Sequence, residues 1–144
     1  MIKRSIEEKL RQMTTKFPVV TLTGARQCGK STLLRQRFGD FKYISLEDLD
    51  RRQFALDDPR GFLMNFGTPL VIDEAQYAPE LFSYIQTVVD GQNKAGMYIL
   101  SGSHNFLLME RISQTLAGRT AVMKMAPLSV RELWQASLLP KNLN

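Results

Sequence analysis

Residues 24–31 constrain the fold more than any other part of the sequence. The segment, GARQCGKS, matches the pattern G-x-x-x-x-G-K-[ST] at every fixed position, and it lies between a β-rich apolar segment at 17–23 and a helical segment at 31–38. Gly24 and Gly29 permit backbone conformations that are closed to other residues, so that successive amide N–H groups point into the loop and surround an anion. Because the N-terminus of the next helix adds partial positive charge, the segment predicts a strand–loop–helix unit that binds phosphate.

The side chains at the end of this loop suit a nucleoside triphosphate. Lys30 can reach the β- and γ-phosphates, the Ser31 hydroxyl can ligate Mg²⁺, and Thr32 can hydrogen-bond a phosphate. Arg26 is expected to point outward, and Cys28 to offer its backbone N–H, with a redox-active thiol as the alternative. A glycine-containing turn that happens to hold a lysine is the alternative for the whole segment. The expected nucleotide contacts are Gly24, Ala25, Arg26, Gln27, Cys28, Gly29, Lys30, Ser31 and Thr32.

An acidic pair supplies the expected partner of this loop. Asp73 and Glu74 follow the apolar segment 69–72, which places them at the carboxyl end of a strand, the edge of a parallel sheet where ligands bind. We expect Asp73 to hold Mg²⁺, directly or through water, and Glu74 to orient and deprotonate the attacking water. Taken alone, the pair is also compatible with an acidic turn at the surface.

The hydrophobic patterns predict strands alternating with helices along the whole chain. Such alternation is typical of an α/β fold in which helices cover both faces of a parallel sheet, here one of five strands. No linker or repeat divides the sequence, so residues 1–144 are expected to form one domain. Strands are predicted at 17–23, 41–46, 69–72, 97–100 and 120–125, and helices at 2–13, 31–38, 105–116 and 127–139, with another opened by Pro79 and one or two short helices in 47–67 broken at 57–59.

Composition limits the chemistry and the compartment. A single cysteine excludes an internal disulfide and a multi-thiolate metal site, and one histidine excludes a multi-histidine site. No apolar run approaches the roughly 20 residues of a membrane-spanning helix, and the N-terminal residues carry charge where a signal peptide would be apolar. We therefore expect a cytoplasmic protein with no membrane partner. The net charge of +5 permits an anionic partner such as nucleic acid without identifying it.

The combination of motifs resembles the AAA-like P-loop ATPases of bacteria and archaea, of the additional-strand catalytic-glutamate type. More narrowly, it is similar to a family whose members usually continue into a winged-helix and nuclease-like C-terminal region of unknown function. The resemblance implies a P-loop NTPase fold, a three-layer α/β/α sandwich with strand order 5-1-4-3-2. It also implies ATP as the nucleotide and Mg-dependent hydrolysis that drives or times an unknown partner process. The matching stretches run in family order at 22–34, 43–48, 71–76, 99–103 and 116–119.

Two further site residues are implied by the resemblance. The polar residue after the fourth strand would sense the γ-phosphate and the attacking water, with Ser103 as the first candidate and Ser101 as the second; a helix N-cap is the alternative for both. Arg119 would act as a finger toward the phosphate of its own or a neighbouring subunit, the latter in a homo-oligomer. The alternative is a salt bridge to a helix or a solvated side chain. His104 is expected at the surface. The expected catalytic residues are therefore Lys30, Glu74, Ser103 and Arg119.

The sequence ends where such ATPases usually have a helical lid or a C-terminal domain. We therefore expect it to be the N-terminal part of a longer protein, able to bind nucleotide but slow to hydrolyse it. Two alternatives stay open. A kinase would transfer the γ-phosphate to a small molecule, although the adjacent acidic pair argues against it because a kinase must exclude water. A nucleotide-switched module would bind DNA or protein through the basic residues at 3, 4, 11, 35, 37, 51 and 52.

Overall fold

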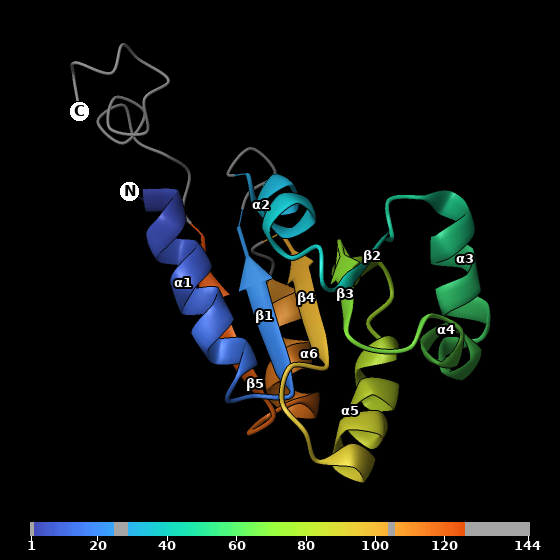
Figure 1. Cartoon of the computed structure of the whole chain (residues 1–144). Helices are drawn as coiled ribbons and strands as arrows, with labels where there is room; N and C mark the ends of the chain where they lie inside the picture. The colour runs from blue at the N-terminus through green and yellow to red at the C-terminus, as the bar shows by residue number, and fades with distance from the viewer. Residues whose placement is uncertain (1, 25–28, 104–105, 126–144) are drawn as a thin grey trace, which may run out of the picture.

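A single parallel sheet organises the chain. The computed structural model describes residues 2–24, 29–103 and 106–125. Within these ranges every strand pairing is parallel, and the strand order is β2-β3-β4-β1-β5, the expected order counted from the other edge (Figure 1). The α/β fold and its topology are thus confirmed. The strands are β1 (Val19–Thr23), β2 (Lys42–Ser45), β3 (Leu70–Asp73), β4 (Tyr98–Gly102) and β5 (Thr120–Lys124).

Helices fill the connections between these strands, as parallel pairing requires. The helix expected at 127–139 lies outside the described residues, as do His104 and four residues of the glycine-rich loop, Ala25, Arg26, Gln27 and Cys28. No described helix is long and apolar enough to cross a membrane. The helices are α1 (Ile2–Thr14), α2 (Lys30–Arg37), α3 (Leu49–Asp57), α4 (Pro59–Phe66), the 3₁₀ helix η2 (Ala75–Tyr77), α5 (Leu81–Gln92) and α6 (Phe106–Thr115).

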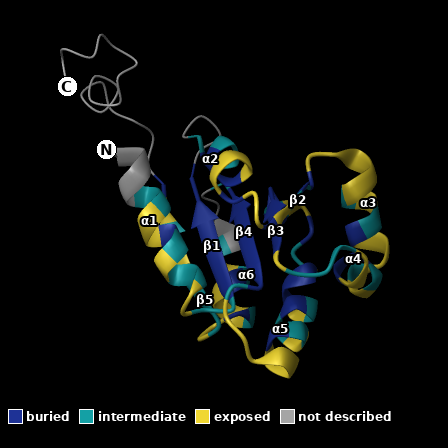
Figure 2. Ribbon diagram, in the orientation of Figure 1, coloured by how far each residue is buried: buried dark blue, intermediate teal, exposed yellow. Residues whose placement is uncertain are grey.

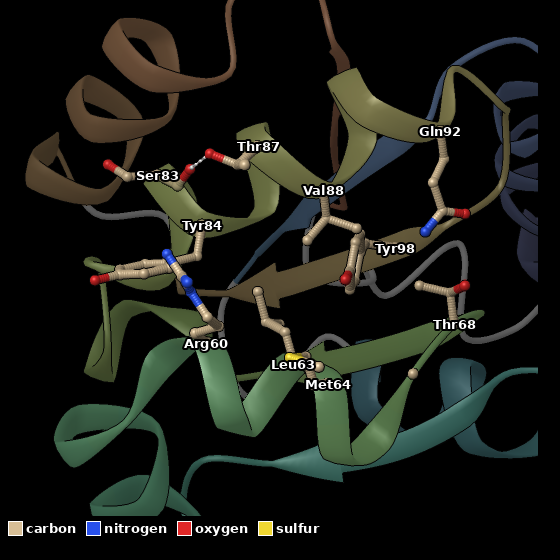
Figure 3. Close-up of a pocket in the computed structure, with 11 residues that line it drawn as sticks. Arg60, Leu63, Met64, Thr68, Ser83, Tyr84, Thr87, Val88, Gln92 and Tyr98 are labelled. Atoms are coloured by element: carbon tan, nitrogen blue, oxygen red, sulfur yellow. Dashed lines mark hydrogen bonds between the residues drawn. The ribbon is translucent and has the colours of Figure 1, made fainter.

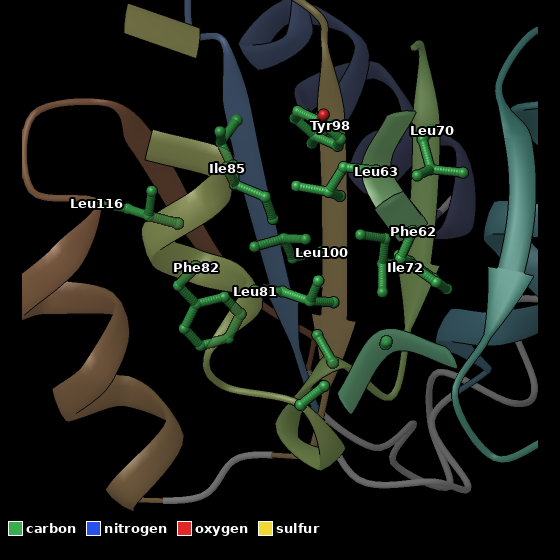
Figure 4. Close-up of a cluster of buried hydrophobic side chains, with 14 of the residues drawn as sticks. Phe62, Leu63, Leu70, Ile72, Leu81, Phe82, Ile85, Tyr98, Leu100 and Leu116 are labelled. Atoms are coloured by element: carbon green, nitrogen blue, oxygen red, sulfur yellow. The ribbon is translucent and has the colours of Figure 1, made fainter. Parts of the chain in front are cut away.

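The sheet separates two apolar clusters, one on each face. Because successive side chains of a strand point to opposite faces, Val71 and Ile99 pack with α1 and α2, while Ile72 and Leu100 pack under the helices of the other face. Figure 2 shows β1, β3 and β4 buried along their lengths, and Figure 4 shows the larger cluster. Burial on both faces explains why these strands read as continuous apolar runs. The larger cluster includes Phe62, Leu63, Leu70, Leu81, Phe82, Ile85, Tyr98 and Leu116.

Two aspartates explain why residues 47–67 form two helices. The Asp48 carboxylate accepts a hydrogen bond from the backbone N–H of Asp50 at 3.0 Å, and so caps the start of α3. Asp58 accepts from the N–H of Gly61 at 3.0 Å and caps α4, whose first residue is Pro59. A proline at the first helical position needs no N–H partner, so the sequence ends one helix and starts the next at the expected break.

Helix α1 packs on the body of the domain, as its pattern predicts. Leu10 is fully buried in the cluster beneath α1 and α2. The guanidinium of Arg11 lies 4.0 Å from the centre of the Phe38 ring and hydrogen-bonds both carboxylate oxygens of Asp40 at 3.0 Å. These contacts join α1 to the segment that follows α2, next to the strand that leads into the glycine-rich loop.

Candidate nucleotide site

The described ends of the glycine-rich loop lie at the carboxyl edge of the sheet. Gly24 follows β1 directly, and its N–H donates to the carbonyl of Gly102 at the end of β4, at 3.1 Å. Gly29 has a φ of 87°, in the left-handed region that strains other residues, and the helix α2 begins at the next residue, Lys30. The turn from strand into helix therefore has the glycine conformation that the motif predicts.

Asp73, at the end of β3, accepts hydrogen bonds from side chains of three other elements. The hydroxyl of Ser31 donates to its Oδ2 at 2.6 Å, and Tyr43 donates to the same oxygen. Ser101 on β4 donates to Oδ1, which also accepts the backbone N–H of Glu74 at 3.0 Å. The carboxylate is thus the point where α2, β2, β3 and β4 meet.

These bonds decide the charge of Asp73. Burial raises the pKa of the carboxyl, but the hydrogen bonds from Ser101, Ser31 and Tyr43 outweigh it and hold the pKa below its usual 3.8. Burial also raises the pKa of Tyr43, and its bond to Asp73 adds to the effect. The phenol of Tyr43 therefore stays protonated and donates a hydrogen bond to the Asp73 carboxylate, which stays ionised at neutral pH.

Lys30 and Glu74 form a buried ion pair beside this network. The Nζ of Lys30 lies 3.7 Å from the Oε2 of Glu74, and their side chains are only 1% and 7% exposed. Glu74 has φ 58° and ψ 46°, a left-handed conformation that is uncommon outside glycine and asparagine. The amide Nε2 of Gln76 donates to the other oxygen of Glu74, Oε1, at 2.7 Å. Both carboxylate oxygens are therefore held.

The oxygen atoms gathered here fit a magnesium ion. Mg²⁺ prefers hard oxygen ligands and is usually bound by one or two protein groups together with substrate phosphates. A serine hydroxyl and an ionised carboxylate at 2.6 Å from each other, Ser31 and Asp73, offer such a donor set. In a P-loop site this pair is the one that Mg²⁺ occupies.

A family model described as an AAA domain matches residues 16–134. The chain belongs to this AAA family of P-loop ATPases. It is 31% identical over 134 residues to the uncharacterized proteins Mb2031c of Mycobacterium bovis and Rv2008c of Mycobacterium tuberculosis, a stretch that covers 91% of this chain. The same stretch spans only 30% of the length of either mycobacterial protein.

Solved structures share the fold of this AAA domain. The Walker-type ATPase PABY2304 of Pyrococcus abyssi superposes with a TM-score of 0.63 at 19% identity, over 97% of this chain and 60% of that one. AMPPCP-bound DnaA from Aquifex aeolicus superposes with a TM-score of 0.56 at 14% identity, over 92% of this chain and 47% of that one. A fold of this kind supports nucleotide binding.

The AAA domain brings together most of the described residues that the sequence singled out. Lys30, Ser31, Asp73 and Glu74 lie in one connected set of contacts. Ser103 follows the end of β4 at the same edge of the sheet and is half-buried. Ser101, the second candidate for the same γ-phosphate-sensing role, is buried and donates a hydrogen bond to Asp73.

Arg119 is not brought to this set of contacts. It precedes β5, where Thr120 is in register with Val19 at the start of β1, so it lies at the amino edge of the sheet, opposite the glycine-rich loop. Its Nε donates to Oδ1 of Asp90 at 2.7 Å and its Nη2 to Oδ2 at 3.0 Å. This position at the amino edge does not suit a finger role toward a phosphate bound at the glycine-rich loop of the same chain. The salt bridge that was the alternative is present.

Tyr43 and Gln76 belong to the site although sequence reasoning gave them no role. Tyr43 lies on β2, in register with Val71 of β3, and so reaches Asp73 across neighbouring strands. Gln76 lies two residues beyond Glu74 on the turn η2. For Gln76 the position two residues after Glu74 was the available signal, whereas the contact of Tyr43 with Asp73 depends on strand register and left no signal in the sequence.

A separate cavity of about 700 Å³ opens between α4 and α5 (Figure 3). Leu63 and Met64 of α4, Tyr84 and Val88 of α5 and Tyr98 of β4 line it. No residue of the nucleotide site is among its lining residues, so the cavity does not belong to that site.

Proposed function

We propose that this AAA domain binds Mg-ATP at the glycine-rich loop and hydrolyses it. The observation that carries the proposal is the 2.6 Å contact of the Ser31 hydroxyl with Asp73, next to the Lys30–Glu74 pair. The contact joins the start of α2 to the end of β3, so it closes the phosphate loop onto the acidic strand. This arrangement is the one that magnesium-dependent phosphoryl transfer requires.

Nucleotide binding involves an exchange of partners at Lys30. The Oε2 of Glu74 lies 3.7 Å from the ammonium group. A triphosphate offers more negative charge than one carboxylate, so Lys30 turns to the phosphates and releases Glu74. The backbone N–H groups at the start of α2 and the partial charge of the helix add to the attraction. The AMPPCP in the similar DnaA structure supports an adenine nucleotide.

Glu74 is the general base of the proposed reaction. Its carboxylate accepts a proton from water, the water oxygen bonds to the γ-phosphorus, and the bond from that phosphorus to the bridging oxygen breaks, leaving ADP and phosphate. Mg²⁺ held by Ser31 and Asp73 would neutralise charge on the β- and γ-phosphates. The network of hydroxyls on Asp73 keeps that carboxylate ionised and oriented for the role.

In this proposal, ATP hydrolysis by the domain serves a further region of the protein or a partner molecule. It spans 30% of the length of its mycobacterial relatives. Hydrolysis in the described domain would drive or time a process of a further region or of a protein or nucleic-acid partner, in the cytoplasm and without a membrane. In a homo-oligomer, Arg119 would have access to a phosphate bound by a neighbouring subunit. Its role as an arginine finger stays a prediction for that arrangement.

Replacement of Lys30 tests the proposal. We expect Lys30→Ala, and the unbranched apolar Lys30→Met, to abolish calorimetrically detectable binding of Mg-ATP. Lys42→Ala serves as the control, because Lys42 is an exposed lysine at the start of β2, away from the carboxyl edge of the sheet. Unchanged affinity in folded Lys30 variants would reject the assignment of the loop.

A further inference from the structure

The cavity between α4 and α5 has the size of a small-molecule site. It holds about 700 Å³, and its walls come from the two helices and from Tyr98, the first residue of β4 (Figure 3). Sites that bind small molecules typically measure about 300–1,000 Å³ and combine apolar walls with a few polar groups. In size the cavity therefore suits one small organic molecule.

Apolar and aromatic side chains form the walls. Leu63 of α4 and Val88 of α5 lie on opposite sides of the cavity (Figure 3). Met64 also lines it and is 77% exposed, so a bound molecule would remove apolar surface from water there. The rings of Tyr84 and Tyr98 line the same space. Because aromatic rings and thioethers make favourable contacts with another ring, these walls favour an aromatic guest.

Arg60 brings positive charge to one end of the cavity. It is the one charged side chain among the described lining residues, and it lies at the same end as Tyr84 (Figure 3). Arg60 is exposed and has no acidic partner in the described part of the chain. A guanidinium group binds a planar carboxylate or a sulfonate through charge-assisted hydrogen bonds. The charge of the cavity therefore favours an anionic ligand.

Tyr98 brings a hydrogen-bonding group to the cavity, on the side away from Arg60 and toward Gln92 (Figure 3). The residue is only 1% exposed, and burial raises the pKa of its phenol to about 12, so the hydroxyl stays neutral at pH 7. Within the described ranges the hydroxyl makes no hydrogen bond, yet protein atoms do not enclose it. From Ser83 to Gln92 the lining part of α5 extends about 13 Å, at about 1.5 Å per residue.

We propose that this cavity binds a small aromatic anion, a ring system that carries one carboxylate or sulfonate. The rings lie between Leu63 and Val88, and the anionic group pairs with Arg60. The Tyr98 hydroxyl is available to a polar substituent toward the other end. Because no residue of the nucleotide site lines the cavity, this binding is independent of Mg-ATP.

Two fluorescent probes that differ in one group test the charge. Anilinonaphthalene sulfonate carries aromatic rings and a sulfonate, and phenylnaphthylamine carries the same rings without the sulfonate. We expect Arg60→Gln to weaken binding of the sulfonate probe to the whole chain about tenfold, and to leave binding of the neutral probe within about twofold. Arg111→Gln is the matched control, since Arg111 is a partly exposed arginine on α6 outside the cavity. Equal binding of the sulfonate probe to Arg60→Gln and the wild type would overturn the proposal.

Cavity-filling variants test the location. We expect Met64→Trp on α4, and Ser83→Trp on α5, to weaken binding of both probes at least about tenfold, because the indole occupies the space of the ligand. Both positions are exposed, so the urea midpoint should stay that of the wild type. Leu56→Trp is the control, at an exposed apolar position of α3 outside the cavity. Unchanged probe binding in both folded cavity variants would overturn the proposal.

Three further results would assign the cavity or the probe differently, and each would overturn the proposal. Displacement of the sulfonate probe by saturating Mg-ATP, with Met64→Trp binding the probe normally, would locate the probe in the nucleotide site. Wild-type dimers that Met64→Trp dissociates, seen by sedimentation, would make the cavity an interface between copies of the chain. Displacement of the probe by decanoate but not by naphthoate would show a preference for an alkyl chain over a ring.

Discussion

The ammonium group of Lys30 lies 3.7 Å from the Oε2 of Glu74, and both side chains are almost wholly excluded from solvent. Two charges buried this way stabilise each other, and removing one partner leaves the other uncompensated. The residue proposed to bind phosphate and the residue proposed to activate water therefore contact each other. Under the proposed function, this contact would couple nucleotide binding to catalysis.

Glu74→Gln should bind Mg-ATP more tightly than the wild type and fail to hydrolyse it. The neutral amide no longer competes with phosphates for Lys30, so we expect affinity to rise about tenfold, equivalent to about 1.4 kcal/mol. Calorimetry measures the affinity and phosphate release measures turnover. Glu80→Gln is the control, because Glu80 forms an exposed pair with Arg111 at 3.7 Å. Normal turnover would reject Glu74 as the base, and weaker binding would reject the competition.

Ser101→Ala should make the domain more sensitive to acid. A carboxyl whose pKa is lowered on folding contributes stability above its ordinary value of 3.8, and that stability is lost as the pH falls through the lowered pKa. Without the Ser101 hydroxyl the pKa of Asp73 rises, so the loss begins at higher pH.

Urea unfolding between neutral and acidic pH measures this effect. At neutral pH we expect Ser101→Ala to be less stable than the wild type by about 1–2 kcal/mol, with the difference narrowing as the pH approaches about 3. Thr87→Ala removes an exposed hydroxyl on α5 and serves as the control. A difference that does not change with pH would show that the Ser101 hydroxyl does not act through the charge of Asp73.

Tyr43→Phe should weaken the magnesium dependence of nucleotide binding. The phenol donates to the same oxygen of Asp73 that Ser31 contacts, and so orients the carboxylate. Groups that orient a metal ligand typically contribute about 10- to 100-fold in metal affinity. Titrating Mg²⁺ at fixed ATP should show this shift, whereas Tyr84→Phe, in the separate cavity, should behave as the wild type. Equal Mg²⁺ titrations for Tyr43→Phe and the wild type would contradict the expectation.

Arg119→Ala and Asp90→Ala should lower the stability of the domain by the same amount. The two side chains form a bidentate, partly exposed pair at the amino edge of the sheet, so removing either should lower stability slightly, and less so in high salt. Neither change should alter ATP affinity or turnover in the monomeric chain. If Arg119→Ala alone slowed hydrolysis, and did so only at concentrations where chains associate, Arg119 would be a finger toward a neighbouring subunit.

Local chemistry explains which parts of the molecule could be predicted. The glycine-rich loop and the acidic pair are defined by residues adjacent in sequence, and Gly29 and Lys30 take the positions that the motif gives them. The end of a helix depends on a single residue. Helix α5 continues through Gly91 and ends at Gln92 because Asn93 adopts the left-handed conformation, with φ 50°.

Contacts that depend on strand register were not predicted. Tyr43 reaches Asp73 only because β2 pairs with β3 in one particular register. The finger role of Arg119 is implied by the resemblance alone, with a salt bridge or a solvated side chain as the alternative. Arg119 precedes β5, and residues that precede the strands of a parallel sheet lie at the edge away from the ligand. The 3₁₀ turn that places Gln76 beside Glu74 leaves no periodic signal in three residues.

The position of β4 between β1 and β3 has a consequence for the size of the ligand that fits. Neighbouring strands are spaced at about 4.8 Å by their backbone hydrogen bonds, so the ends of β1 and β3 stand about 10 Å apart. Main-chain hydrogen bonds set that spacing. Substitutions of side chains at this edge of the sheet will therefore change the charges presented there, while the distance between the two strand ends stays the same.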